Sequence, residues 1–312
     1  MSTMGGIPNP SNNDSVEKER AKLDLGPALR FIAKYRQTFR ESIESLRKRK
    51  PTEVAQNLAK RLEFSDVGKI KGPQLSPDDV RDILVRMPRP LIQLSKLEKI
   101  SYIYGGDVIE PVYKADGSIE TGNTVPVEDW GKEGEHAKHP ERILIGLTPF
   151  DGKSILQSAL PSNIYESDDD ALAYQTHVII HEFFHTVQQP LMAPAPDTRS
   201  SVILEADGER FTFKEWWDDF EKMITEGDEG YVSRYASSYA NRLTPVMKRT
   251  DEVEYNRALA EQMGESFVAH QLNIISNDEG WTNFKEARPQ TWALMDKLCR
   301  AKLVSKGDKI ET

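Results

Sequence analysis

The segment HVIIHEFFHTVQQP, residues 177–190, constrains the fold of this chain more than any other stretch. Its histidines recur at every fourth position, and Glu182 directly follows the second of them. Residues four apart lie on one face of an α-helix, so the imidazoles of His181 and His185 point toward one spot. The other positions are largely apolar. This predicts a buried helix whose polar groups need partners, because an unpaired buried polar group costs about 1–3 kcal/mol.

The pattern H-E-x-x-H over residues 181–185 indicates a metal site. Two neutral imidazoles suit zinc, and the glutamate is placed to act as general base toward a water that the metal activates. The competing hypothesis is a core helix with ordinary hydrogen-bonded histidines. The context favours the metal, because Ser167 and Asp170 form a capping-box pattern ahead of the helix and Pro190 is expected to end it.

His177 stands one turn before His181 on the same face of this helix. Three such positions along a straight helix span about 12 Å, whereas zinc–nitrogen bonds are about 2 Å long. We therefore expect His177 either to contact a residue that binds the metal or to belong to the core.

A third ligand is expected from a distant part of the chain, because no histidine follows at the spacing of the extended motif. The segment ALAEQMGESF places Glu261 and Glu265 one turn apart on one face among apolar residues, where an unpaired charge is unusual. Glu261 is predicted to bind the metal, and Glu265 to accept a hydrogen bond that fixes the tautomer of a ligating imidazole. His270 is the second choice of ligand, and a solvated acidic face is the alternative for the two glutamates.

Helix and strand signals also occur away from this segment. Apolar periodicity and capping residues predict helices over residues 27–50, 52–64, 77–87, 212–224, 251–275 and 290–303. β-Branched and aromatic residues, interrupted by Gly-Gly and Asp-Gly, predict strands over residues 100–127 and 141–150. The basic residues 47–50 suit the C-terminus of the first helix, and a nuclear-localisation patch is the alternative.

Together these elements predict an α+β fold. A small twisted sheet, drawn from residues 100–160, should lie over the histidine helix, with residues 143–147 as its edge strand. We divide the chain into a disordered polar tail over residues 1–20, a helical region of unknown role over residues 21–95, and a metal-binding domain over residues 96–312.

Composition and charge exclude several classes of protein. The formal net charge of -9 argues against a dedicated nucleic-acid binder. A single cysteine, Cys299, excludes an internal disulfide framework and a multi-cysteine zinc cluster. No stretch approaches about 18 consecutive apolar residues, and the N-terminus lacks the regions of a secretory signal, so we expect no membrane span and no signal peptide. The expected location is the cytoplasm, or the outside by a non-classical route as an effector or virion component.

With these motifs in hand, the chain resembles the gluzincin zinc metallopeptidases, and within them the catalytic domain of anthrax lethal factor and related toxin-like and phage-borne zincins. The resemblance covers roughly residues 140–300. It rests on HEFFHTV as the active helix, AEQMGESF as the glutamate helix, YVSRYASSYA as the segment before it, and ARPQTWALMDKL as a closing helix. It implies a zincin-like fold and a zinc endopeptidase acting on a protein or peptide substrate.

The resemblance also implies roles for single residues. By it, His181, His185 and Glu261 bind Zn²⁺, Glu182 is the general base, and Glu265 supports a ligand.

The resemblance further implies that Tyr235 donates a hydrogen bond to the developing oxyanion. In the family this tyrosine lies only a few residues before the ligand glutamate, whereas here 26 positions separate Tyr235 from Glu261. Tyr239 is therefore a competitor, and Tyr255 a weaker one. The alternative function is a catalytically silent zincin-like scaffold that binds metal. A DNA-binding regulator is disfavoured because residues 30–50 contain no clear helix-turn-helix pattern.

Overall fold

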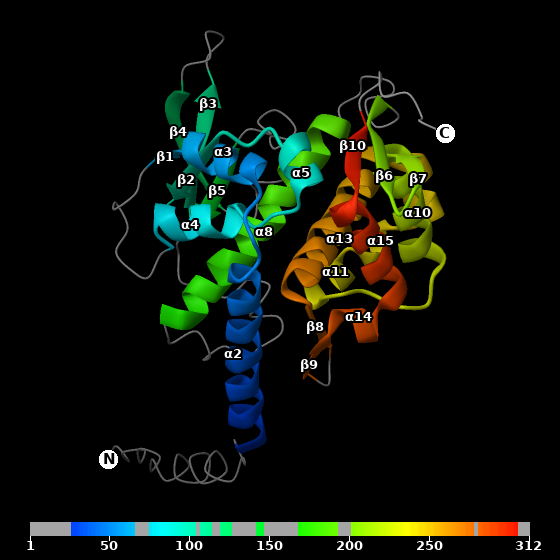
Figure 1. The fold of residues 1–312 in the computed structure, drawn as a ribbon, viewed down its shortest axis with the longest axis horizontal. Helices are drawn as coiled ribbons and strands as arrows, with labels where there is room; N and C mark the ends of the chain where they lie inside the picture. The colour runs from blue at the N-terminus through cyan, green and yellow to red at the C-terminus, as the bar shows by residue number, and fades with distance from the viewer. Residues whose placement is uncertain are drawn as a thin grey trace, which may run out of the picture.

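The computed structural model describes residues 26–65, 75–103, 107–113, 119–126, 142–146, 168–192, 201–277 and 280–304. This part of the chain mixes helices with small sheets, as the sequence predicts (Figure 1). Its helices are α2 (Gly26–Arg47), α3 (Glu53–Arg61), α4 (Pro77–Leu84), α5 (Arg89–Leu94), α8 (Asp168–Met192), α10 (Phe213–Glu226), α11 (Arg234–Ser238), η2 (Ala240–Arg242), α12 (Pro245–Thr250), α13 (Glu252–Leu272), α14 (Phe284–Ala287) and α15 (Pro289–Arg300). Its strands are β1 (Glu63–Ser65), β2 (Lys99–Ile103), β3 (Asp107–Tyr113), β4 (Ile119–Pro126), β5 (Arg142–Gly146), β6 (Ile203–Ala206), β7 (Glu209–Thr212), β8 (Ile274–Asn277), β9 (Gly280–Asn283) and β10 (Lys302–Val304).

A three-stranded parallel sheet in the order β1-β2-β5 lies beside the histidine helix α8, which β5 contacts. Ile100 of β2 is in register with Ile143 of β5, and both side chains are buried. Within the described residues β5 is an edge strand of this sheet, as predicted for residues 143–147. The sheet also takes its first strand, β1, from well before residue 100, which was not expected.

The predicted helix over residues 52–64 was wrong at its C-terminal end. The helix stops at Arg61, and Glu63–Ser65 form β1 instead. Phe64 of this strand is in register with Ile100 of β2. Pairing with a distant strand thus outweighs the local helical pattern, because strand preference depends mainly on the neighbours that a segment finds in the fold.

The histidine helix α8 continues beyond its expected end, and the prediction that Pro190 stops it was wrong by two residues. Pro190 has no amide proton to donate to the carbonyl of Thr186, four residues earlier. That carbonyl faces the Lys96 amide at 3.5 Å, so it keeps a partner and the helix runs on to Met192. The predicted cap at Ser167 lies outside the described residues.

The helices α8 and α13 pack against each other and form the centre of the hydrophobic core. Phe184 of α8 stacks on Phe267 of α13, with ring centroids 4.7 Å apart. Figure 1 shows α8 crossing the molecule between the strands β1, β2 and β5 on one side and α10, α13 and α15 on the other. The same buried cluster includes Leu58 and Ile83, so the core and the parallel sheet both extend across the boundary predicted near residue 95.

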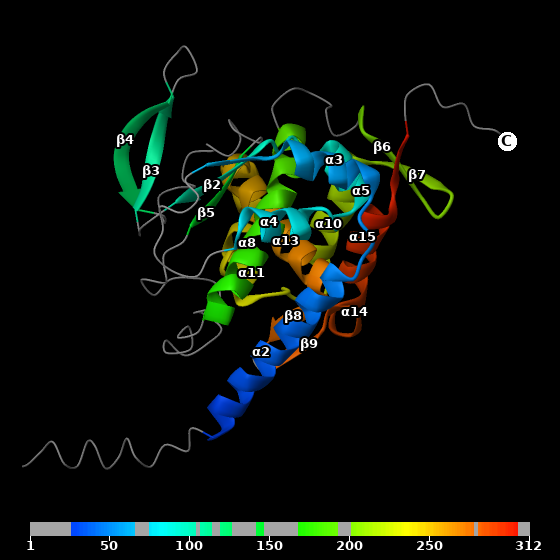
Figure 2. The ribbon, with the colours of Figure 1, turned by 60° about the vertical axis from the view of Figure 1, so that its left-hand side comes forward.

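A second sheet, in the order β10-β6-β7, was not predicted. Its hairpin turns at Asp207 and Gly208, whose φ angles are 53° and 82°. Two consecutive positive φ angles suit the Asp-Gly pair, the strongest short-range hairpin signal in a sequence. Figure 2 shows that α2 and the β3–β4 hairpin project from the body in different directions.

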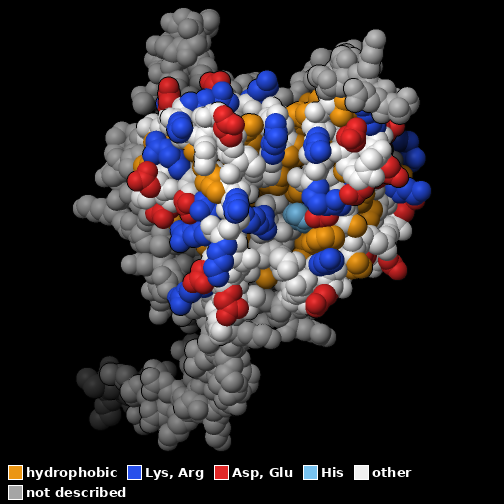
Figure 3. All heavy atoms as spheres, in the orientation of Figure 1, with side chains coloured by type: hydrophobic (Ala, Val, Ile, Leu, Met, Phe, Trp, Pro, Cys, Tyr) orange, Lys and Arg blue, Asp and Glu red, His pale blue; other side chains and the backbone are white. Residues whose placement is uncertain are grey.

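Basic side chains gather over α2, α3 and α4 on the face seen in Figure 3, interleaved with acidic ones. Arg47, in the last turn of α2, pairs with Asp79 at 3.4 Å and with Asp82 at 3.6 Å. Arg49 donates hydrogen bonds to the side chain and backbone oxygens of Gln271 at 2.5 and 2.6 Å. Two of the basic side chains at residues 47–50 therefore form ion pairs or hydrogen bonds within the fold. This suits the interpretation of these residues as the end of a helix.

Candidate metal centre

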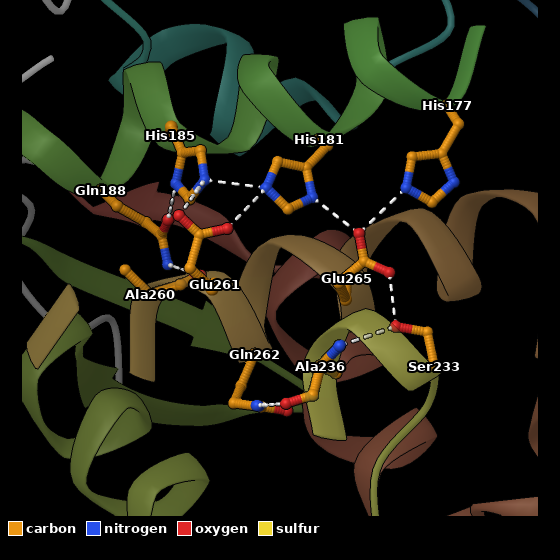
Figure 4. Close-up of polar contacts among 10 residues, drawn as sticks. All are labelled: His177, His181, His185, Gln188, Ser233, Ala236, Ala260, Glu261, Gln262 and Glu265. Atoms are coloured by element: carbon orange, nitrogen blue, oxygen red, sulfur yellow. Dashed lines mark hydrogen bonds and ion pairs between the residues drawn. The ribbon is translucent and has the colours of Figure 1, made fainter. Parts of the chain in front are cut away.

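The helix α13 has clear signals at both ends, which is why it forms at this place. The side chain of Asp251 accepts a hydrogen bond from the Glu254 amide at 3.0 Å and caps its N-terminus. Asn273 adopts the left-handed backbone conformation, with φ of 54°, and ends the helix. Between these ends the helix lies along α8, so that the polar faces of the two helices meet (Figure 4).

Four potential ligand atoms from three side chains converge where these faces meet. The Nε2 atoms of His181 and His185 lie 2.9 Å apart. Glu261 Oε2 is 3.2 Å from Nε2 of His181, and Glu261 Oε1 is 3.8 Å from Nε2 of His185. Both histidines are buried, and the Glu261 side chain is only 15% exposed. The structure therefore brings together the ligand set that the sequence predicts.

The second nitrogen of each ring shows which tautomer it carries. His181 Nδ1 lies 2.9 Å from Glu265 Oε1, a carboxylate oxygen that can only accept, so Nδ1 is the donor. His185 Nδ1 lies 2.8 Å from Gln188 Oε1. The Gln188 amide nitrogen faces the Ala260 carbonyl and the sulfur of Met263, which leaves Oε1 as the acceptor for His185. When either ring is neutral, its lone pair is therefore on Nε2.

Lone pairs on two imidazoles and a carboxylate oxygen that face one another repel, unless a cation lies between them. A tetrahedral site with bonds of about 2.0–2.1 Å places its ligand atoms about 3.3 Å apart. The observed separations of 2.9, 3.2 and 3.8 Å lie on both sides of that value. The buried His and Glu residues thus form a group that can hold a metal ion.

The charges of the cluster point to the same conclusion. Burial by itself lowers the pKa of His181, but its hydrogen bonds to Glu261 and Glu265 outweigh burial and raise that pKa well above the usual 6.5. Burial by itself raises the pKa of Glu261, but its hydrogen bonds to His181 and His185 outweigh burial and hold that pKa well below 4.5. Without a metal, a proton on His181 is the cation that the cluster favours.

A second grouping, of His177, His181 and Glu265, also has its ligand atoms within 4.8 Å of one another. Here, however, Glu265 Oε1 already accepts hydrogen bonds from His177 Nε2 and His181 Nδ1, both at 2.9 Å. Its other oxygen accepts from Ser233 Oγ at 2.6 Å. Glu265 is therefore a buried carboxylate with both oxygens hydrogen-bonded, on the Nδ1 side of His181. His177 contacts the same carboxylate. The Nε2 side of His181 is therefore the side that has ligand atoms left to offer an ion.

Glu182 lies beside the converging ligands. One of its carboxylate oxygens is within 4.8 Å of a ring nitrogen of His181 and of a ring nitrogen of His185. The residue is only partly buried, in contrast to the histidines on either side of it. The carboxylates of Glu182 and Glu261 are thus both close to the two imidazoles, with Glu261 nearest to Nε2 of His181, at 3.2 Å.

The structure separates the tyrosine candidates. Tyr235 lies on the short helix α11, but its side chain lies outside the described residues, so its role stays a prediction. Tyr239 ends that helix, and the guanidinium of Arg242 lies over its ring at 4.8 Å. Tyr255 donates its hydroxyl proton to Glu221 of α10 at 2.7 Å. Tyr255 therefore has a structural partner away from the metal ligands.

The structure does not bring His270 to the other histidines. It lies nine residues after Glu261, which is about 13–14 Å along α13. Its Nε2 is 3.4 Å from Asp296 Oδ1 of α15, and burial lowers its pKa to about 4. His270 is therefore a neutral residue packed between two helices.

Two residues of this site were not singled out from the sequence. One is Gln188, which lies one turn after His185 on the same helix. Gly264 lies between Glu261 and Glu265 on α13 and packs against the ring of His181. The i, i+3 spacing of Gln188 was a usable signal, whereas the role of Gly264 depends on the contact between two helices.

These features define a class of site, a buried two-histidine, one-glutamate centre held between two helices, with a further glutamate beside it. Comparison with known proteins adds no relative: no family model matches the chain, and neither a curated protein nor a solved structure shows significant similarity to it. Within the described residues, no helix combines the length and apolar character needed to cross a membrane.

Proposed function

We propose that this protein is a zinc-dependent endopeptidase of the zincin type that hydrolyses peptide bonds of a protein substrate. One observation carries the proposal. Nε2 of His181, Nε2 of His185 and the carboxylate oxygens of Glu261 converge within 2.9–3.8 Å, while Glu182 lies beside them.

The donor set supports zinc among the divalent metals. Two imidazole nitrogens and one carboxylate oxygen form the set that catalytic zinc sites use, with a fourth position left for water or substrate. Hard cations such as Mg²⁺ and Ca²⁺ prefer oxygen ligands throughout. Hydrogen bonds from the outer ring nitrogens to Glu265 and Gln188 are the arrangement that orients ligating histidines and makes them more basic.

The chemistry that a bound zinc ion supplies here is Lewis acidity, which lowers the pKa of a water to about 7 and polarises a carbonyl group. The chain's own residues do the rest. Glu182 accepts the proton of the attacking water and passes it to the departing amine. Glu265 and Gln188 keep the two rings in the tautomer that leaves Nε2 free to bind the metal. A tyrosine of the α11 segment, Tyr235 or Tyr239, donates a hydrogen bond to the developing oxyanion.

The parallel sheet offers a place for the substrate backbone. β5 is an edge strand within the described residues, and it contacts α8. An extended peptide that adds to such an edge is held by main-chain hydrogen bonds, while side-chain pockets select its sequence. The substrate that this arrangement suits is therefore an extended segment of a protein.

The test is the isosteric substitution Glu182→Gln in the full chain. Because Glu182 moves a proton and does not bind the metal, zinc content should stay unchanged, while cleavage of a peptide library should fall by about 10²- to 10⁴-fold. Glu252→Gln, at an exposed glutamate at the start of α13, is the matched control and should cleave like the wild type. Retained cleavage by the Glu182→Gln protein would reject this mechanism.

The second candidate function is a zincin-like scaffold that binds metal and cuts nothing. The close packing of the ligand cluster favours this scaffold, because the same contacts also connect α8 to α13. Incubating the wild-type protein with the peptide library, with and without a chelator, separates the two candidates. Chelator-sensitive cleavage supports the peptidase, and zinc binding without any cleavage supports the scaffold.

A further inference from the structure

An unbroken series of hydrogen bonds leads from the candidate ligand His181 to the backbone of α11 (Figure 4). His181 Nδ1 donates to Glu265 Oε1 at 2.9 Å, and Glu265 Oε2 accepts from Ser233 Oγ at 2.6 Å. Ser233 Oγ in turn accepts the amide proton of Ala236 at 3.0 Å and so caps α11. The single hydroxyl proton of Ser233 goes to Glu265, so this residue joins the carboxylate to the helix.

A second contact anchors α11 to the same helix. The side-chain amide of Gln262, the residue after Glu261, donates to the Ala236 carbonyl. Gln262 is fully buried, and its Oε1 has no hydrogen-bond partner among the described residues. A buried acceptor without a partner lowers stability, so burial alone does not account for a glutamine at this position. Its hydrogen bond to α11 does. Ser233, which is bonded to Glu265, and Gln262, which follows Glu261, thus both hold α11.

We propose that Ser233 is a positioning residue that couples the occupancy of the metal centre to the placement of α11, the helix that carries Tyr235. The proposal rests on the proposed function, because it assigns the coupled site to zinc. A metal bound at Nε2 of His181 keeps the Nδ1 proton directed at Glu265, and the fixed carboxylate then holds Ser233 and the first turn of α11. The chain would thereby hold the helix of its candidate oxyanion donor more firmly when the ligands are occupied.

The competing explanation is that Ser233 only caps α11. Capping needs an acceptor oxygen at position 233, and aspartate is as good a cap as serine. The link to Glu265 needs a donor at the same position, which an ionised aspartate does not have. Ser233→Asp therefore keeps the cap and breaks the link, because it places a second carboxylate against Glu265. Ser233→Thr keeps both functions and serves as the matched control.

The experiment uses the full-length protein and its Ser233→Asp and Ser233→Thr variants, with zinc as the only added ligand. Exchange of the α11 amides, those of Ala236 and Ser237 above all, is followed with and without zinc. In the wild type and in Ser233→Thr, zinc should slow this exchange about tenfold, a coupling of ordinary size between two sites. Coupling is reciprocal, so Ser233→Asp should lose the protection and bind zinc about tenfold more weakly in a competition titration with a chelator.

The outcomes separate this inference from the proposed function. If the wild type binds no zinc, the proposed function fails and the coupling fails with it. If zinc binds but leaves α11 exchange unchanged, or if Ser233→Asp matches Ser233→Thr in both measurements, the coupling is rejected while the zinc site stands. Gln262→Met, which removes the second anchor without touching Ser233, should speed α11 exchange both with and without zinc.

Discussion

Gly264 of α13 lies directly against the imidazole of His181: a Cβ built on this glycine would be 2.9 Å from Cε1 and 3.1 Å from Nε2 of that ring. The ring cannot easily move aside, because its nitrogens lie 2.9 Å from Glu265 and 3.2 Å from Glu261, on either side of Gly264 in the same helix. The absence of a side chain at position 264 therefore allows α13 to approach close enough for Glu261 and Glu265 to reach His181 from both sides.

The first prediction concerns this close approach. Gly264→Ala should weaken zinc binding by at least about tenfold, as expected when a ligand loses its orientation. Alanine is the better helix former by about 0.8–1.0 kcal/mol, so local propensity alone would stabilise the variant. A metal-buffered titration measures the affinity, and thermal unfolding measures the stability. An affinity equal to that of the wild type would show that the ring has room to shift.

The second prediction concerns the third ligand. Glu261→Ala should lower zinc affinity by at least about 100-fold, more than the 10- to 100-fold typical of residues that only support a ligand. Metal content after gel filtration is the measurement. Glu254→Ala, two turns earlier on the same helix, is the control and should keep its zinc. Full occupancy of the Glu261→Ala protein would move the third ligand elsewhere.

The third prediction concerns Gln188, which fixes the tautomer of His185. Gln188→Met keeps the size of the side chain but removes the acceptor for His185 Nδ1. The neutral ring is then free to carry its proton on Nε2, where it blocks the metal. Zinc affinity should fall about tenfold. The measurements are the metal-buffered zinc titration and the thermal unfolding of the metal-free protein. We expect zinc affinity to fall while the Tm of the metal-free protein stays close to that of the wild type.

The fourth prediction concerns pH in the absence of metal. Because the folded-state pKa of His181 is raised above 6.5, its contribution to stability is complete below pH 6.5 and is lost as pH rises through the folded-state value. Glu261 acts in the opposite sense: its contribution is complete above pH 4.5 and is lost as pH falls through its lowered pKa. The Tm of the metal-free protein should therefore decline as pH rises above about 6.5, through the raised pKa of His181.

Zinc must displace the proton of His181, which adds a second observable to this prediction. The increase in Tm on adding zinc should grow over the same pH range, because less protonated His181 remains to compete. At pH 7, calorimetry in buffers of different ionisation enthalpy should show about one proton released for each zinc bound. A zinc-induced shift in Tm that is independent of pH would contradict the assignment of the proton to His181.

Much of the site could be read from residues that are neighbours along one helix. His181 and His185 share a helical face, with Glu182 next to it, whatever the rest of the chain does, and Glu261 and Glu265 share another. The two predicted sets lie together in the fold because neither helix alone offers partners to its buried polar groups. α8 carries histidines among apolar residues, and α13 carries glutamates among alanine, methionine and phenylalanine. Pairing the two helices satisfies both.

Other features were outside the reach of sequence patterns. The end of the second helix was misplaced because Phe64 finds its partner, Ile100, across a parallel sheet. Pro190 failed to stop α8 because Lys96, from a different segment, faces the carbonyl that the proline leaves free. In both places a contact between segments distant in sequence outweighed the local signal.

The sequence by itself determined which polar side chains share a helical face, because helical periodicity alone places His181 with His185 and Glu261 with Glu265. The tertiary structure decided how they meet. Register between two packed helices, made possible by the missing side chain at Gly264, sets which nitrogen faces which carboxylate. It also joined Ser233 to Glu265, since a hydrogen bond across 32 residues depends on where the chain returns and not on the pattern it carries.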